Sequence, residues 1–164
     1  MSGGGTVRVL GIAGSLRRGS FNAATLRTAQ ELAPAGMTIE SFDIAPIPLY
    51  NEDVRQQGFP APVEDLRARI KAADGLLLVT PEYNYSIPGV LKNAIDWASR
   101  PPNHLRQTCV YLDMLPLNKP EVFVSAAHQK VDAEGRLSDE PARAAIRALL
   151  EALAAWARRL GRAG

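Results

Sequence analysis

The stretch VRVLGIAGSLRRGSFNAATLRTAQELA, residues 7–33, joins a short apolar run, a loop rich in glycine and serine, and a helical pattern. The apolar and partly β-branched run from Val7 to Ile12 is typical of a β-strand. Residues 22–33 have helical composition, with apolar side chains on one face. A strand, a tight loop and a helix in this order predict an α/β fold.

The rest of the chain continues this alternation. Further strands are predicted over residues 37–42 and 76–79, and helices over residues 62–73, 91–98 and 142–160. The continuous run LLLV at 76–79 is typical of a strand covered on both faces. Residues 46–62 contain four prolines and predict a long irregular loop. The pattern indicates a doubly wound parallel sheet.

The alternation breaks once, after the helix over residues 91–98. Residues 103–112 predict a second helix, and a strand follows only at residues 121–125. The first helix carries the chain roughly 18 Å from the loop end of the sheet, whereas the four residues that follow it recover at most about 14 Å. Either the last strand is not parallel, or a strand-containing segment is missing between Pro102 and Asn103.

Length, composition and charge limit the classes of function. A chain of 164 residues fits one domain, and we expect residues 1–5 to form a flexible leader and residues 6–164 a single domain. The 19 basic and 17 acidic side chains are too evenly balanced to indicate a nucleic acid or a membrane as partner. No apolar stretch is long enough to span a bilayer. The single cysteine excludes an intrachain disulfide and indicates a reducing, cytoplasmic setting.

The loop GSLRRGSFN, residues 14–22, lies where ligands bind in open α/β sheets, beyond the end of a strand and before a helix that favours an anion. Its side chains supply hydroxyl, amide and guanidinium donors: Ser15, Ser20, Asn22, and Arg17 or Arg18. The glycine spacing fits neither the triphosphate P-loop nor the dinucleotide fingerprint. The loop therefore predicts a site for a phosphate monoester, and the alternative is an ordinary turn with exposed arginines.

The stretch TPEYNYSIPGVLKNAIDW, residues 80–97, begins where the predicted strand over residues 76–79 ends. Its polar and aromatic loop, Tyr83 to Ser86, precedes a helix that Pro88 introduces. Such a loop can present backbone N–H groups and ring edges to a flat heterocycle, and the helix N-terminus behind it stabilises negative charge on a reduced ring. The alternative is that the tyrosines pack against the sheet or against a partner subunit.

Together, GSLRRGSFN and PEYNYSIPGVLKNAIDW closely resemble the NADPH-dependent FMN reductase family, flavodoxin-like flavoproteins that include quinone, chromate and azo-dye reductases. The resemblance covers nearly the whole chain and implies a flavodoxin-like doubly wound parallel sheet. It implies that the FMN phosphate is held by Ser15, Arg17, Ser20 and Asn22, with Phe21 nearby. It also implies that the isoalloxazine is bordered by Pro81, Glu82, Tyr83, Asn84 and Tyr85.

In this family a further strand and a second glycine-rich loop follow the NAIDW helix, and neither is found in this sequence. The fold prediction is therefore a flavodoxin-like sheet from which the fourth strand and its glycine-rich loop are absent. The resemblance implies FMN-dependent transfer of hydride from NADPH or NADH to a small acceptor, such as a quinone, flavin, chromate or azo compound. No side chain need act as a catalytic group, because the flavin carries the chemistry. The resemblance also implies a homodimer or homotetramer.

The competing interpretation is a non-catalytic FMN-binding protein, or a flavin-free interaction protein, with an incomplete flavin site. No metal site is predicted, because His104 and His128 are far apart and have no carboxylate or cysteine at ligand spacing. The sequence at residues 132–135 resembles a turn more than a calcium loop. Trp97 and Trp156 are interpreted as core residues or as part of a subunit interface.

Overall fold

The computed structural model describes residues 5–99, 115–132 and 134–161. The helix predicted over residues 103–112 and the junction between Pro102 and Asn103 lie outside these ranges. Three parallel strands, β1 (Val7–Ala13), β2 (Met37–Phe42) and β3 (Gly75–Val79), form a sheet in the order β2-β1-β3. Val7 is in register with Met37, and Val9 with Gly75. The predicted parallel sheet is confirmed over the described residues.

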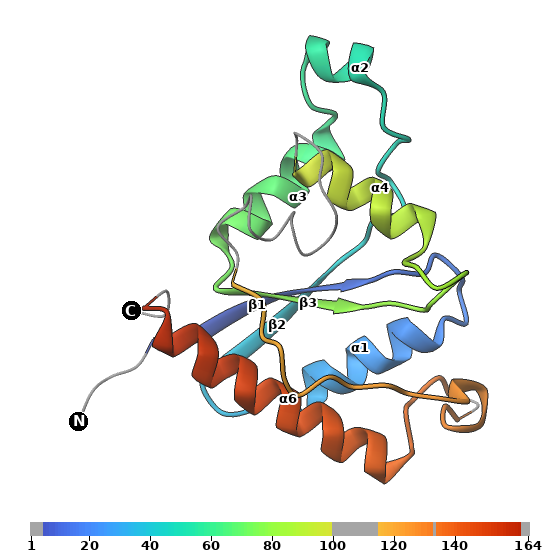
Figure 1. The fold of residues 1–164 in the computed structure, drawn as a ribbon, viewed down its shortest axis with the longest axis vertical. Helices are drawn as coiled ribbons and strands as arrows, with labels where there is room; N and C mark the ends of the chain where they lie inside the picture. The colour runs from blue at the N-terminus through green and yellow to red at the C-terminus, as the bar shows by residue number, and fades with distance from the viewer. Residues whose placement is uncertain (1–4, 100–114, 133, 162–164) are drawn as a thin grey trace.

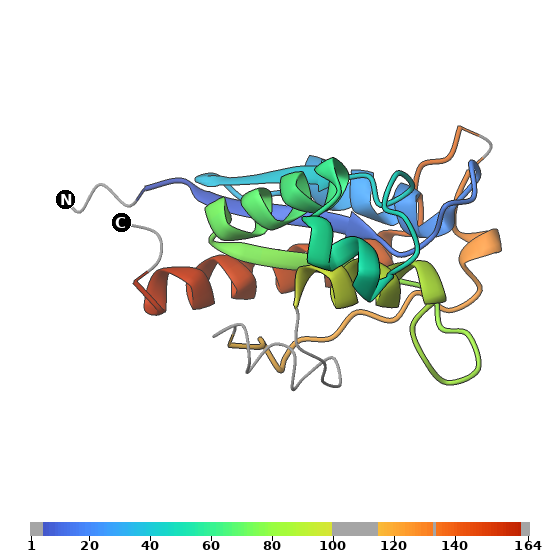
Figure 2. The same ribbon diagram turned by 90° about the horizontal axis from the view of Figure 1, so that it is seen from above.

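Helices cover both faces of this sheet (Figures 1 and 2). One face carries α1 (Phe21–Glu31) and α6 (Glu140–Arg159), and the other carries α3 (Ala61–Ala72) and α4 (Gly89–Ala98). Alternate side chains of a strand point to opposite faces. Val7 and Val9 therefore pack in a core with α1 and α6, whereas Leu10 and Ile12 pack in a second core with α3 and α4. This double layer is the doubly wound architecture that the sequence predicts.

Local signals explain where the longest helix begins and ends. The Asp139 carboxylate accepts a hydrogen bond from the backbone N–H of Ala142 at 3.0 Å, which caps α6. Arg158 and Arg159 lie in the last turn, where positive charge complements the helix dipole. Leu150 is fully buried on the face toward the sheet.

The predicted irregular loop at residues 46–62 contains one helix, α2 (Glu52–Gln57), so this prediction is wrong in part. The Asn51 side chain caps α2 by accepting from the N–H of Asp53 at 2.9 Å, and the Glu52 carboxylate pairs with Arg55 one turn on. None of the residues of α2 is buried. The helix projects from the body of the protein (Figure 1).

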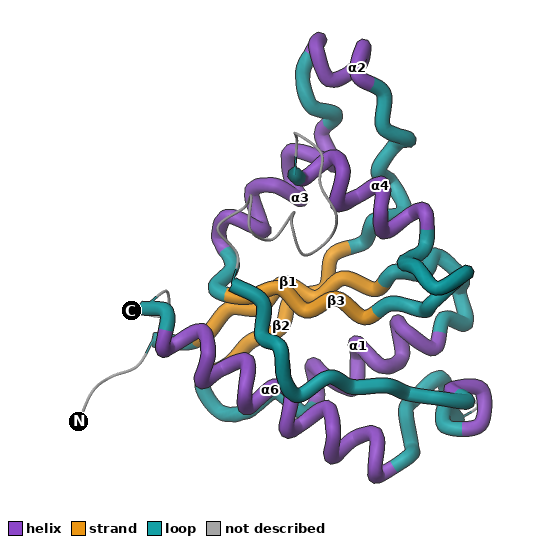
Figure 3. The backbone as a smooth tube through the Cα atoms, in the orientation of Figure 1, coloured by secondary structure: helices purple, strands orange, loops and turns teal. Residues whose placement is uncertain are grey.

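The predicted strand at residues 121–125 is also wrong, because the structure has an extended loop there (Figure 3). Val122 and Val124 pack against the core beside α6, but no described strand is adjacent to provide the ladder of hydrogen bonds that a strand requires. A related difference concerns β3, in which Leu77 is buried whereas Leu76 and Leu78 are only partly covered. Both differences occur at the edge of the described sheet that β3 forms.

Candidate functional site

The two loops singled out by sequence meet at the carboxyl ends of β1 and β3 (Figure 1). The backbone N–H of Gly14 donates to the carbonyl of Val79 at 2.8 Å. A Cβ atom on Gly14 would lie 2.6 Å from the Thr80 hydroxyl oxygen and 3.0 Å from a methyl group of Leu91. Only glycine fits at such a close approach, so this residue holds together two motifs that are far apart in the sequence.

The first loop ends in a capped helix N-terminus. The N–H of Ser20 donates to the carbonyl of Arg17 at 3.0 Å, and the Ser20 hydroxyl oxygen accepts from the N–H of Ala23 at 3.3 Å. Ser20 is therefore the N-cap of α1, and its hydroxyl proton remains available to donate. The N–H groups of Phe21 and Asn22 have no intrahelical acceptor because they belong to the first turn. This end of α1 carries the positive pole of the helix dipole.

The two arginines of the loop differ in their surroundings. Arg17 donates to the carbonyl of Gly19 at 2.9 Å, and its guanidinium carbon lies 4.9 Å from the centre of the Phe21 ring. It therefore braces the loop. Arg18 is exposed and has no ion pair with any described residue. Because Ser15 and Asn22 are only partly buried and have no hydrogen-bond partner among the described residues, their side chains are free to bind a ligand.

The second loop is a tight hairpin at the end of β3. The N–H of Tyr83 donates to the carbonyl of Ser86 at 2.9 Å, and the N–H of Ser86 donates back to Tyr83 at 2.9 Å. Asn84 and Tyr85 have φ angles of 52° and 60°, as the two central residues of a type I′ turn do. A tyrosine in this left-handed conformation is strained, which is a property of functional loops.

The side chains of this hairpin point to solvent. Tyr83 is 58% exposed and Tyr85 98% exposed. The interpretation that the tyrosines pack against the sheet is therefore wrong, because a two-residue turn directs them away from it. Packing against a partner subunit and contact with a ligand both remain consistent with their exposure.

A cavity of about 1420 Å³ extends from these loops along β3. The predicted residues that border it are Phe21, Asn22, Pro81, Glu82 and Tyr85. The other predicted residues, Ser15, Arg17, Ser20, Tyr83 and Asn84, lie on the same two loops but do not line this cavity. Sequence reasoning missed Thr80, which borders the cavity and contacts the position of Gly14. Its place directly after an apolar strand was the available signal.

The donors of the first loop fit a phosphate monoester. They comprise the N–H groups of the helix N-terminus, the side chains of Ser15 and Asn22, which have no hydrogen-bond partner in the described part of the chain, and the guanidinium of Arg18. Together they offer hydrogen bonds to several oxygens of one anion. The residues from Pro81 to Tyr85 lie beside this anion site, where they can border a flat ring. The arrangement therefore fits FMN, with its phosphate on the first loop. Among the described residues, no three histidine, cysteine or acidic side chains cluster to hold a metal ion.

A comparison with solved structures shows the class of fold. The structure matches FerB, a flavoenzyme NAD(P)H:acceptor oxidoreductase from Paracoccus denitrificans, with a TM-score of 0.77 and 27% identity over 93% of this chain and 98% of the FerB chain. The chain therefore has a flavodoxin-like fold, as predicted, and the absence of a fourth strand from the described sheet is consistent with that match.

The family follows from the sequence. The model of the NADPH-dependent FMN reductase family matches residues 7–104, and the chain belongs to this family. An NAD(P)H-dependent FMN reductase from Pseudomonas aeruginosa is 54% identical over 94% of this chain and 97% of its own. A quinone reductase from Escherichia coli K12 is 44% identical over 82% of this chain and 86% of its own. In the described part of the chain, no helix has the length and apolar character needed to cross a membrane.

Proposed function

We propose that this protein is an FMN-dependent NAD(P)H oxidoreductase that reduces a small acceptor such as a quinone. The observation that carries the proposal is the convergence of a donor-rich loop and an exposed tyrosine hairpin at the ends of adjacent strands, held together by the contact between Gly14 and Thr80. A loop of phosphate donors beside a loop that borders a flat ring is what FMN requires. Relatives that are named FMN reductase and quinone reductase support the assignment.

Each loop has a distinct role in this proposal. Ser15, Ser20 and Asn22 would donate to the FMN phosphate together with the N-terminal N–H groups of α1, while Arg17 keeps the loop in shape through Gly19. When bound, FMN supplies the two-electron chemistry between NAD(P)H and the acceptor. Arg18, which has no ion pair with a described residue, is placed to attract the extra phosphate of NADPH.

The second loop would border the flavin ring through Pro81, Glu82 and Tyr85. The hairpin uses the N–H of Tyr83 internally, which leaves the neighbouring N–H groups of Glu82 and Asn84 to stabilise negative charge on the ring. The exposed ring of Tyr85 would offer a flat surface to the acceptor.

We further propose that the protein acts in the cytoplasm as a homodimer or homotetramer. The single cysteine and the use of NAD(P)H support the location. The exposed tyrosines of the hairpin support association, because aromatic residues are enriched at protein interfaces. Sedimentation equilibrium of the purified protein tests the oligomeric state.

The test is a visible spectrum of the protein after incubation with FMN and desalting, followed by anaerobic addition of NADPH. We expect flavin bands that bleach, and steady oxidation of NADPH once a quinone is added. Retained flavin that does not bleach would favour the non-catalytic carrier, and a colourless protein would favour a flavin-free protein.

A matched pair of substitutions locates the phosphate site. Ser15→Ala removes one donor to a charged group, a hydrogen bond of about 1.5–3 kcal/mol, and should weaken FMN binding about 10- to 150-fold. Ser41→Ala removes an exposed hydroxyl on β2 and should leave FMN affinity unchanged. Equal affinities for the two variants would contradict the assignment of the phosphate loop.

A further inference from the structure

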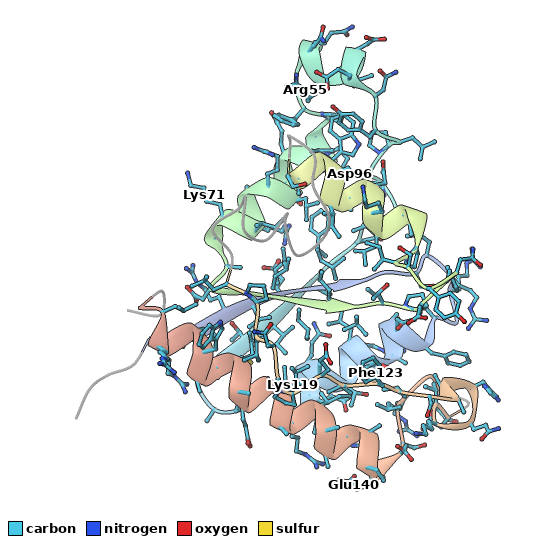
Figure 4. All side chains as sticks on the ribbon, viewed as in Figure 1. Arg55, Lys71, Asp96, Lys119, Phe123 and Glu140 are labelled. Carbon is cyan, nitrogen blue, oxygen red and sulfur yellow. The ribbon has the colours of Figure 1, made fainter. Side chains whose placement is uncertain are left out.

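The long part of the cavity lies away from the two loops and forms a slot along the edge of the described sheet, beside β3. One wall is β3, and the opposite wall is the extended segment 115–125, on which Lys119 and Phe123 are labelled in Figure 4. Leu149, Leu153 and Trp156 of α6 close one side. Most of the lining is therefore aliphatic or aromatic.

The edge of β3 that faces this slot has the features of an interior strand. In the described sheet β3 pairs with β1 alone. The carbonyl of Val79 accepts from the N–H of Gly14 at the end of β1, so the alternation of a strand turns the backbone groups of Gly75 and Leu77 toward β1 and the N–H groups of Leu76 and Leu78 toward the slot. Residues 75–79 contain neither a charge nor a proline, the usual protections of an edge strand.

The relatives are longer than this chain within the region they share with it. The alignment with the Pseudomonas aeruginosa reductase extends over 179 residues, although it uses 94% of this chain, or about 154 residues. About 25 residues of that relative therefore have no counterpart here. The alignment with the quinone oxidoreductase from Solanum tuberosum, 183 residues over the same 94%, gives about 29. A strand and a loop require a segment of about this length.

The size of the cavity fits one strand. A strand rises about 3.3 Å per residue, lies about 4.8 Å from its neighbour and belongs to a layer about 10 Å thick, so five to seven residues require roughly 800–1,100 Å³. The cavity of about 1420 Å³ also includes the space beside the two loops, and it has no room for a second strand.

We propose that this slot binds one extended, uncharged and apolar segment of another polypeptide, which adds a strand to the free edge of β3. The outward-facing backbone of Leu76 and Leu78 would supply the hydrogen bonds, and apolar side chains of the lining, such as Leu77 and Leu149, would supply the apolar contacts. The occupant takes the place of the segment that the relatives carry within their own chain. Flavin is not involved, so the proposal can fail while the proposed function stands.

The test uses a fluorescein-labelled peptide with the sequence of the Pseudomonas aeruginosa segment that has no counterpart in this chain. Its binding to the full-length protein is measured by fluorescence anisotropy, with a scrambled peptide of the same composition as control. We expect saturable binding of the native peptide at least tenfold tighter than that of the scrambled one. Equal binding of the two would overturn the proposal in favour of a generic apolar surface.

Two variants test whether the peptide binds in the slot. Leu76→Pro removes an outward-facing N–H near the start of β3, on the edge where proline is tolerated, and should weaken the binding of the peptide at least tenfold while the circular dichroism stays native. Inserting the same segment between Pro102 and Asn103 should fill the slot and abolish peptide binding even if the proline variant does not fold. Undiminished peptide binding to the insertion variant would overturn the proposal. So would a dimer of the parent chain that Leu76→Pro converts to monomer, because the occupant would then be a second copy.

Discussion

Substitution of Gly14 by alanine tests whether the two loops depend on each other. The new methyl group would lie 2.6 Å from the Thr80 hydroxyl oxygen and 3.0 Å from both the Thr80 Cβ and a Leu91 methyl group, distances at which the neighbours must move. Overpacking of this kind costs about 1–3 kcal/mol. For a chain of this size each kcal/mol lowers the melting temperature by about 2–4 °C, so we expect a decrease of about 2–12 °C.

The matched control is Gly19→Ala in the same loop, where a Cβ would meet nothing within 4 Å. Its φ angle is not positive, so we expect a change within about 0.5 kcal/mol. Both variants are unfolded with urea and followed by circular dichroism, and their FMN dissociation constants are measured by fluorescence quenching. Gly14→Ala should lower both the free energy of unfolding and the affinity for FMN.

The double variant Gly14→Ala/Thr80→Ala removes the oxygen that the new methyl group meets. If the contact is the cause, the two substitutions together should destabilise the protein by at least about 0.5 kcal/mol less than the sum of the single effects. The reasoning is refuted if Gly14→Ala is as stable as Gly19→Ala, or if the two effects simply add.

Further predictions concern the core and the projecting helix. Leu150→Ala should lower the free energy of unfolding by about 2–5 kcal/mol, because the side chain is fully buried; a urea titration that shows less than 1 kcal/mol would contradict this. Trp97→Phe should cost about 1–3 kcal/mol, since it removes the hydrogen bond from the indole N–H to the carbonyl of Pro48 at 2.9 Å and leaves space around a fully buried ring; an unchanged melting temperature would contradict this. Hydrogen bonds from Arg55, and then from Tyr50, lower the pKa of Glu52 to about 2. This pair therefore favours the folded state above about pH 4.5 and loses its effect as the pH falls toward 2. An NMR titration should show the pKa of Glu52 returning toward its ordinary value in Arg55→Ala, and an unshifted titration there would count against the assigned cause.

Much of the framework could be predicted because it follows from local patterns. The apolar stripe of α6 locates that helix, and the alternation of strand and helix predicts the parallel sheet. Helix α2 was missed because the surrounding prolines favoured a loop. The Asn51 cap and the acidic residues that follow it were signals for that helix.

The strand predicted at residues 121–125 failed for a different reason. Val122 and Val124 have the composition of a strand, but a strand exists only beside a neighbour that accepts its hydrogen bonds. A sequence window reports the preference of its own residues and carries no information about whether a neighbour is present. The partial exposure of Leu76 and Leu78 has the same origin.

The sequence predicted which loops form the site, but it did not predict the contacts between their atoms. The position of both loops follows from the rule that ligands lie at the carboxyl ends of parallel strands. The contact between Gly14 and Thr80 depends on how two distant segments pack, so the spacing in sequence could not reveal it. The type I′ turn was missed because Asn84 is followed by Tyr85, whereas glycine usually occupies that position.

The two cores on either side of the sheet are completed at different times during synthesis. Among the described residues, the core that contains Leu10 and Trp97 uses none beyond Ala98, whereas the other core needs the side chains of α6, as far as Ala157. At about 5–20 residues per second, the ribosome takes about 3–12 s to add the roughly 60 residues between these points. During that interval one face of the sheet in the nascent chain can be covered by its helices, while the apolar side chains of the other face, which include Val7 and Val9, are not yet covered by α6. We therefore expect chaperones to bind this nascent chain late, and on the side that α6 will cover.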